Sequence, residues 1–223
     1  MKMKNLLYKE IRLCIPVQIW IFVGLSCLIL IPSWPAMVAF VYPLSGFLSL
    51  FPTCLANRDL LYTATLPLEK KKVVLGKVLL LGFLELLSML FSVPFGLVRV
   101  FFLNPMIPAS EAYADLGVNL ATYGFGLLGF ALFNLIFVPL YYKSPDSKNV
   151  GATLVSYFVT LVFFGVVMAA FIAVPGASSW INSWSGPGLW GQIGIFAGGA
   201  ILFFLFNALA YKLGSKSFQK IDL

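Results

Sequence analysis

Six apolar runs, each close to the length of a membrane-crossing helix, dominate this sequence. They cover residues 15–31, 36–55, 73–101, 116–142, 150–174 and 191–211. About 20 apolar residues are needed for a helix to cross the hydrocarbon core of a bilayer. Only 10% of the residues are charged, whereas a soluble domain carries about 25%. We therefore expect an all-α polytopic membrane protein whose residues 1–223 form a single transmembrane domain.

The positions of Lys and Arg predict the orientation of the six spans. Basic residues are enriched in cytoplasmic loops. Fourteen of the fifteen lie before the first run, in or beside the segment between runs two and three, between runs four and five, or after run six: Lys2, Lys4, Lys9, Arg12, Arg58, Lys70, Lys71, Lys72, Lys77, Lys143, Lys148, Lys212, Lys216 and Lys220. Only Arg99 lies toward the other side. The pattern predicts a multi-pass protein of the plasma membrane with both termini in the cytoplasm.

Composition also excludes several classes of function. The net charge of +7 comes from short loops beside apolar runs and forms no basic domain, so we expect no nucleic-acid partner. The chain has no His, the usual general base and commonest metal ligand. Its three cysteines, Cys14, Cys27 and Cys54, are scattered over apolar segments. We therefore expect no catalytic residue and no metal site, and we do not expect an enzyme.

The first 14 residues have the spacing of an amphipathic helix. Leu6, Leu7, Ile11 and Cys14 would share one face, and the basic residues between them could reach an anionic inner leaflet. Two interpretations are open: an interfacial elbow helix over residues 1–14, which we favour, or a simple basic flank of the first span.

The segment 57–77, NRDLLYTATLPLEKKKVVLGK, is the main polar interruption between two apolar runs. Asn57 could cap a short helix over residues 57–66, with Asp59 favourably placed at its positive end. Lys70, Lys71 and Lys72 would then hold the start of the third span at the inner leaflet. The residues alone leave two alternatives: a surface for a cytosolic partner, or a loop that only sets topology.

The pattern N-x-D-L-x5-L-P-L-x-K-x2-V-V-L-G-K in this segment resembles the cytoplasmic loop of type-2 ABC-exporter permeases. It is most similar to the small bacterial six-span subfamily that includes permeases of phenol-soluble-modulin peptide exporters. That subfamily commonly has Ser where this chain has Thr65, and a polar or basic residue where it has Glu69. The pattern covers about a tenth of the chain, and the six runs and the N-terminal helix agree with the subfamily over the whole length.

The resemblance implies a transmembrane permease that exports amphipathic or antimicrobial-type peptides, such as phenol-soluble modulins. Related permeases move drugs or lipids, which is the alternative. The segment 57–66 would be the coupling helix that docks on a cytosolic ATPase. The residues expected to couple to the ATPase are Asn57, Arg58, Asp59, Leu60, Leu61, Tyr62, Ala64 and Thr65. The residues expected to anchor the loop at the inner leaflet are Lys70, Lys71, Lys72 and Lys77.

Energy would come from partner chains. Gly76-Lys77 lacks the upstream Gly and the following Ser or Thr of a P-loop, so this chain is expected to hold no cofactor. The implied partners are two cytosolic ABC ATPase subunits, which would bind ATP and magnesium, and a second permease chain, most simply a homodimer, all in contact with membrane lipid.

Glu85 lies near the middle of the third run. An ionisable residue there is costly and indicates function by default, so it could line the transport pathway; alternatively it bonds to another helix. A self-contained secondary transporter would need several such carboxylates, and this is the less favoured function. Gly194 and Gly198 have the spacing of a close helix contact, either within the chain or at a dimer seam. The tryptophan-rich segment 175–190 suits either an interfacial anchor or a lid.

Overall fold

The computed structural model describes residues 3–64, 69–106, 117–143 and 150–221, with the side chains of residues 3–5, 60, 61 and 64 outside the description. Over these ranges the chain forms helices joined by turns, with no strand. The prediction of an all-helical chain is confirmed.

In chain order the helices are α1 (Met3–Cys14), α2 (Val17–Gly24), the 3₁₀ helix η1 (Leu25–Leu30), α3 (Val38–Ala56), α4 (Asp59–Ala64), α5 (Lys70–Val98), the π-helical turn η2 (Arg99–Leu103), η3 (Asn104–Met106), α6 (Leu120–Tyr141), α7 (Val150–Ala173), α8 (Ala177–Ile181) and α9 (Gly186–Gln219). By length and composition, five of the described helices could cross a membrane: α3, α5 with its continuation to Met106, α6, α7 and α9. Counting the bent pair α1 and α2–η1 as one span would make six. These helices are compatible with the polytopic membrane protein expected from the sequence.

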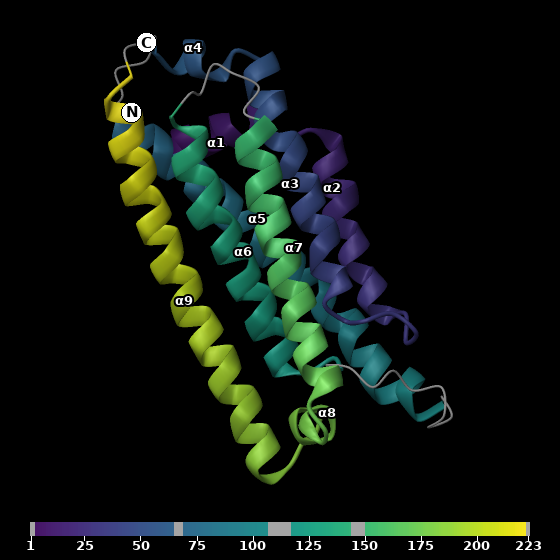
Figure 1. Cartoon of the computed structure of the whole chain (residues 1–223). Helices are drawn as coiled ribbons and strands as arrows, with labels where there is room; N and C mark the ends of the chain where they lie inside the picture. The colour runs from purple at the N-terminus through teal and green to yellow at the C-terminus, as the bar shows by residue number, and fades with distance from the viewer. Residues whose placement is uncertain (1–2, 65–68, 107–116, 144–149, 222–223) are drawn as a thin grey trace.

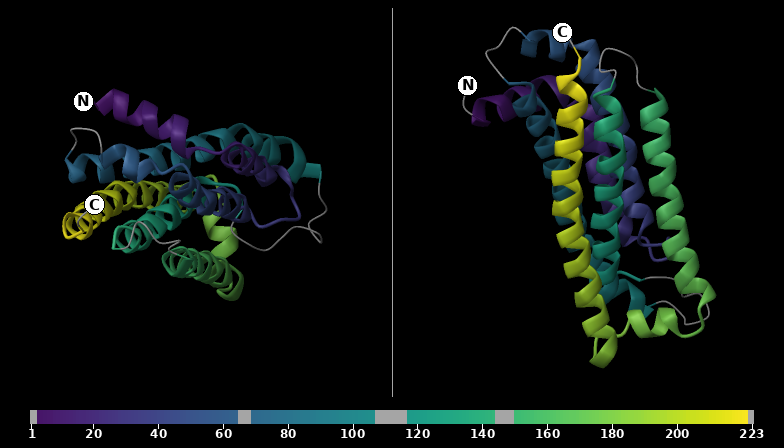
Figure 2. Two further views of the ribbon diagram at one scale, coloured as in Figure 1. Left: turned by 90° about the horizontal axis from the view of Figure 1, so that it is seen from above. Right: turned by 60° about the vertical axis from the view of Figure 1, so that its left-hand side comes forward.

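The long helices run side by side, and the short ones lie at the two ends of the bundle (Figure 1). Helix α1 crosses one end of the bundle, at 88° to the α2–η1 segment that follows it. Helix α4 and both ends of the chain lie at this same end, whereas α8 lies at the opposite end (Figures 1 and 2). The layout therefore separates a polar end, with α1 and α4, from an end that carries the tryptophan-rich segment.

The first apolar run is not a uniform α-helix. Pro16 precedes α2 in an extended conformation (φ −75°, ψ 159°), and α2 changes to 3₁₀ geometry after eight residues. Arg99 donates hydrogen bonds of 3.1 Å to the carbonyls of Ile29, Pro32 and Trp34 in the hairpin that follows. Its side chain is 4% exposed, so it ties the end of α5 to the α2–α3 hairpin.

Helices α6 and α9 approach each other closely at two glycines. A Cβ on Gly199 would lie 2.2 Å from the carbonyl oxygen of Gly124, and a Cβ on Gly124 would lie 2.6 Å from that of Ile195. A Cβ at Gly194 or Gly198 would meet no atom within 4 Å. Gly194 and Gly198 therefore make no close helix contact within this chain, and the alternative that they lie at a contact between two chains stays a prediction.

Candidate functional site

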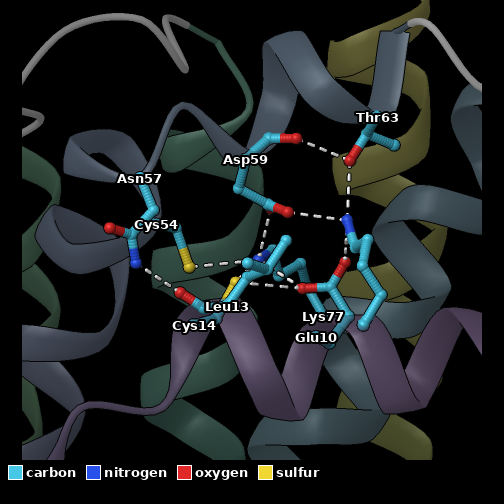
Figure 3. A network of polar contacts seen from close by, with 9 residues as sticks. Glu10, Leu13, Cys14, Cys54, Asn57, Asp59, Thr63 and Lys77 are labelled. Carbon is cyan, nitrogen blue, oxygen red and sulfur yellow. Dashed lines mark hydrogen bonds and ion pairs between the residues drawn. The ribbon is translucent and has the colours of Figure 1, made fainter.

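At the polar end of the bundle, α1, α3, α4 and α5 meet around a cluster of buried side chains (Figure 3). A sharp turn between α3 and α4 brings these helices together. Asn57 ends α3, and Arg58 has a left-handed backbone conformation (φ 51°), which is costly for a residue with a Cβ. Because of this turn, α4 begins at Asp59 and directs that carboxylate back toward α1 and α5.

Four charged side chains of this cluster form a closed ring of alternating sign, which we call the charge ring: Lys9, Glu10, Asp59 and Lys77. The Lys9 ammonium lies 2.6 Å from Oδ1 of Asp59 and 2.8 Å from Oε1 of Glu10. The Lys77 ammonium lies 2.8 Å from Oδ2 of Asp59 and also pairs with Oε2 of Glu10. Each carboxylate thus bridges both ammonium groups, and the ring joins α1, α4 and α5.

The charge ring is almost closed to solvent. Lys9 is 8% exposed, Lys77 1%, and both carboxylates 0%. Burial alone would raise the pKa of Asp59, but Lys77 and Lys9 outweigh it and hold that pKa below its usual value. Burial likewise opposes the charge of Lys9, yet Glu10 and Asp59 raise its pKa above the usual value. A buried ion is tolerated when its counter-ions are close and well placed, and this ring meets that condition with no net charge.

Uncharged groups complete the cluster. Lys9 donates a 2.6 Å hydrogen bond to Oγ1 of Thr63, one turn along α4 from Asp59. Asn57 donates a 2.7 Å bond to the carbonyl of Leu13, near the end of α1. Helix α4 and the turn before it are therefore fixed to α1 by side chains at three positions, Asn57, Asp59 and Thr63.

Two thiols lie against the Lys77 ammonium, which is 2.7 Å from Sγ of Cys14 and 3.1 Å from Sγ of Cys54. These sulfurs and an oxygen of Asp59 lie within 4.8 Å of one another, an arrangement that could hold a metal ion. Thiolate and carboxylate ligands suit zinc. Here the Lys77 ammonium contacts all three groups and supplies the positive charge itself.

The segment expected to meet a partner divides into inward and outward residues. Asp59, one of the residues expected to couple to the ATPase, is 0% exposed and belongs to the charge ring, so its carboxylate faces α1 and α5. Asn57 follows α3 and bonds to α1 instead of capping α4. Arg58 is exposed, and Tyr62 is 52% exposed. The side chains of Leu60, Leu61 and Ala64, and all of Thr65, lie outside the described part of the chain.

The four lysines expected at the inner leaflet occupy different environments. Lys71 is exposed, and Lys72 forms an exposed 2.9 Å ion pair with Glu69. Lys70 donates to the carbonyl of Ile221, which ties the start of α5 to the C-terminal end of α9. Lys77 differs from the anchoring role expected for it, because its ammonium is buried in the charge ring instead of reaching a lipid surface.

Glu85 lies in a second, smaller polar contact, between α5, α6 and α9. Its Oε2 accepts a 2.9 Å hydrogen bond from the side-chain amide of Asn134, which also donates to Asn207 at 3.0 Å. Glu85 and Asn134 are both 0% exposed. This placement matches the alternative in which Glu85 bonds to another helix, and it does not open the carboxyl to a pathway in this conformation.

Sequence reasoning missed Lys9, Glu10, Cys14 and Cys54 as parts of one site. It assigned Cys14 to an apolar face and Lys9 to the leaflet, whereas both point into the cluster with Glu10. Two signals were present. Glu10 is the one acidic residue in a basic N-terminal stretch, and Lys77 stands inside an apolar run. Each such charge requires an opposite charge elsewhere in the fold.

No protein-family model, curated protein or solved structure shows a significant match to this chain. The function must therefore be argued from the residues and their geometry.

Proposed function

We propose that this chain is the transmembrane permease subunit of an ATP-driven ABC exporter. Its proposed cargo is amphipathic or antimicrobial-type peptides, such as phenol-soluble modulins. The observation that carries the proposal is the charge ring, which fastens the short helix α4 to α1 and α5 through Asp59 and Lys77. A push or pull on α4 would reach both helices, because a buried ion pair resists separation.

This arrangement suits a coupling helix. The inward side of α4 supplies Asp59 and Thr63, whereas Arg58 and Tyr62 stay exposed next to them. An ATPase subunit would contact the outward side, and ATP and magnesium would bind in that partner. The inward side would pass its movement to α5, whose continuous apolar stretch reaches the far end of the bundle.

A second copy of the permease is part of the proposal. Over the 18-residue apolar stretch that could cross a membrane, only 22% of α7 and 17% of α9 is buried inside the chain. Apolar faces of this size must contact lipid or another chain. Six spans enclose little space alone, so we propose a homodimer served by two ATPase subunits.

The test is to purify the chain in a mild detergent and ask whether an ATP-binding protein accompanies it. Leu61→Asp in α4 should abolish co-purification and ATPase stimulation while the permease still folds, and Lys71→Ala, outside α4, is the matched control. We expect ATPase binding to be lost in Leu61→Asp and retained in Lys71→Ala. An unaltered complex in Leu61→Asp, or no ATPase with the unaltered chain, would overturn the proposal.

A further inference from the structure

The contact between Glu85 and Asn134 contains two buried acceptors with no partner. Oε1 of Glu85 and Oδ1 of Asn134 both lack a hydrogen-bond partner. The other half of the contact is complete, since the Asn134 amide donates to Oε2. Buried polar atoms are almost always paired, so two unpaired oxygens in adjacent side chains indicate that a donor belongs between them.

Within the described part of the chain, no cation lies where it could supply that donor to Glu85. The nearest basic residue on α5 is Lys77, two turns away, about 12 Å along the helix axis, and it is already held by Glu10 and Asp59. Toward the other end of α5, Arg99 bonds to the α2–α3 hairpin. Helices α3 and α6 contain no charged residue.

The other titratable groups around Glu85 are equally unsuited. On α9, Lys212 is exposed and lies more than a turn beyond Asn207, the residue that reaches this contact. Among the α1 side chains that the structure describes, the acidic and basic ones are Lys9, Glu10 and Arg12; the first two belong to the charge ring and Arg12 is exposed.

A single proton would satisfy both oxygens. Protonation converts a carboxylate from acceptor only to acceptor and donor. Glu85 Oε1 could then donate to Asn134 Oδ1 while Asn134 Nδ2 donates to Glu85 Oε2, which gives a reciprocal pair of hydrogen bonds between an acid and an amide. An ionised carboxylate buried without a counter-ion is so costly that such groups become neutral instead.

We infer that Glu85 and Asn134 form a proton-binding site in the interior of the helix bundle, with the proton on Glu85 while α5, α6 and α9 are packed as in this structure. Separation of α5 from α6 would break the reciprocal pair and expose the carboxyl, so the site would release its proton when these helices part. This inference does not depend on the exporter proposal, because it concerns the resting contact.

The test is infrared spectroscopy of the whole chain at neutral pH in vesicles of ether-linked phosphatidylcholine, which has no ester carbonyl to overlap the carboxyl band. A protonated carboxyl has a carbonyl band distinct from that of a carboxylate. We expect one such band at neutral pH, lost in Glu85→Gln, which keeps the shape and removes the acid. Glu69→Gln, at an exposed carboxylate, should leave the band unchanged.

Asn134→Leu provides a second assignment that does not depend on changing the acid itself. Removing the amide donor should shift the Glu85 band to higher frequency without abolishing it. The inference is overturned if the unaltered chain has no protonated-carboxyl band at neutral pH, as expected of an ionised Glu85 with a bound cation. It is also overturned if the band survives unchanged in both Glu85→Gln and Asn134→Leu.

Discussion

Lys77 is the residue on which the polar end of the bundle depends most. Its ammonium contacts both carboxylates of the charge ring and both buried thiols. Removing it would leave Glu10 and Asp59 to share the single charge of Lys9. The remaining net negative charge would be buried, and water could not solvate it because both carboxylates are 0% exposed.

Lys77→Met should therefore destabilise the chain strongly, by about 3–5 kcal/mol, the range observed when one partner of a buried ion pair is removed. The free energy of unfolding in detergent measures the effect. Lys71→Met, at an exposed lysine of the same helix, should stay within about 0.5 kcal/mol of the unaltered chain. Equal effects of the two substitutions would show that the charge ring contributes little.

The same residues mark where prediction from sequence reached its limit. The apolar runs identified the long helices, because their length and composition are local properties. The charge ring joins residues 9, 10, 59 and 77, which lie in three separate segments of the sequence, so no local sequence pattern predicts that they pair. A lysine near the end of an apolar run is ordinarily expected to extend to the lipid surface. Only the three-dimensional approach of α1 and α4 makes burial of Lys77 the better solution.

Among the elements, α4 is the one whose position depends on charge. Its buried contacts include Asp59 and Thr63, both bonded to Lys9 of α1. Short helices have little stability of their own, so α4 should stay in place only while Asp59 remains ionised.

The stability that Asp59 provides should therefore depend on pH. Its pKa is lowered in the folded chain, so its contribution is fully present above the unfolded pKa, about 3.9. The contribution is lost as the pH falls through the lower folded pKa. Asp59→Asn should be less stable than the unaltered chain at neutral pH, and the difference should shrink on acidification below about pH 4. Thermal melting over a pH series measures this, and a gap that is constant with pH would contradict it.

The pairing of α6 with α9 depends on shape instead of charge. Gly199→Ala would place a methyl group 2.2 Å from a backbone oxygen of α6, which must force the helices apart. We expect a loss of about 1–3 kcal/mol, typical of overpacking. Gly198→Ala is the matched control, because its Cβ would meet nothing within 4 Å and Ala favours a helix by about 1 kcal/mol over Gly. If Gly199→Ala and Gly198→Ala had the same free energy of unfolding, the close contact between α6 and α9 would not lie at Gly199.

At the scale of the whole molecule, α5 connects the two ends of the bundle. With its continuation to Met106 it spans 37 residues, about 55 Å at the rise of an α-helix. Lys77 fastens one end to the charge ring and Arg99 fastens the other to the α2–α3 hairpin. Movement of α4 would therefore reach the far end of the bundle through a single element, as the proposed transport cycle requires.

This scheme requires the charge ring to face the cytoplasm, which cysteine labelling in intact cells can test. The background is Cys27→Ser, since Cys14 and Cys54 are buried while Cys27 is only partly so. In that background, Ser179→Cys, at an exposed position of α8, should react with a membrane-impermeant maleimide added outside. Lys71→Cys should react only after the membrane is opened, because excess Lys and Arg retain a loop in the cytoplasm. The reverse pattern would place α4 outside and remove the route by which a cytosolic ATPase could drive this chain.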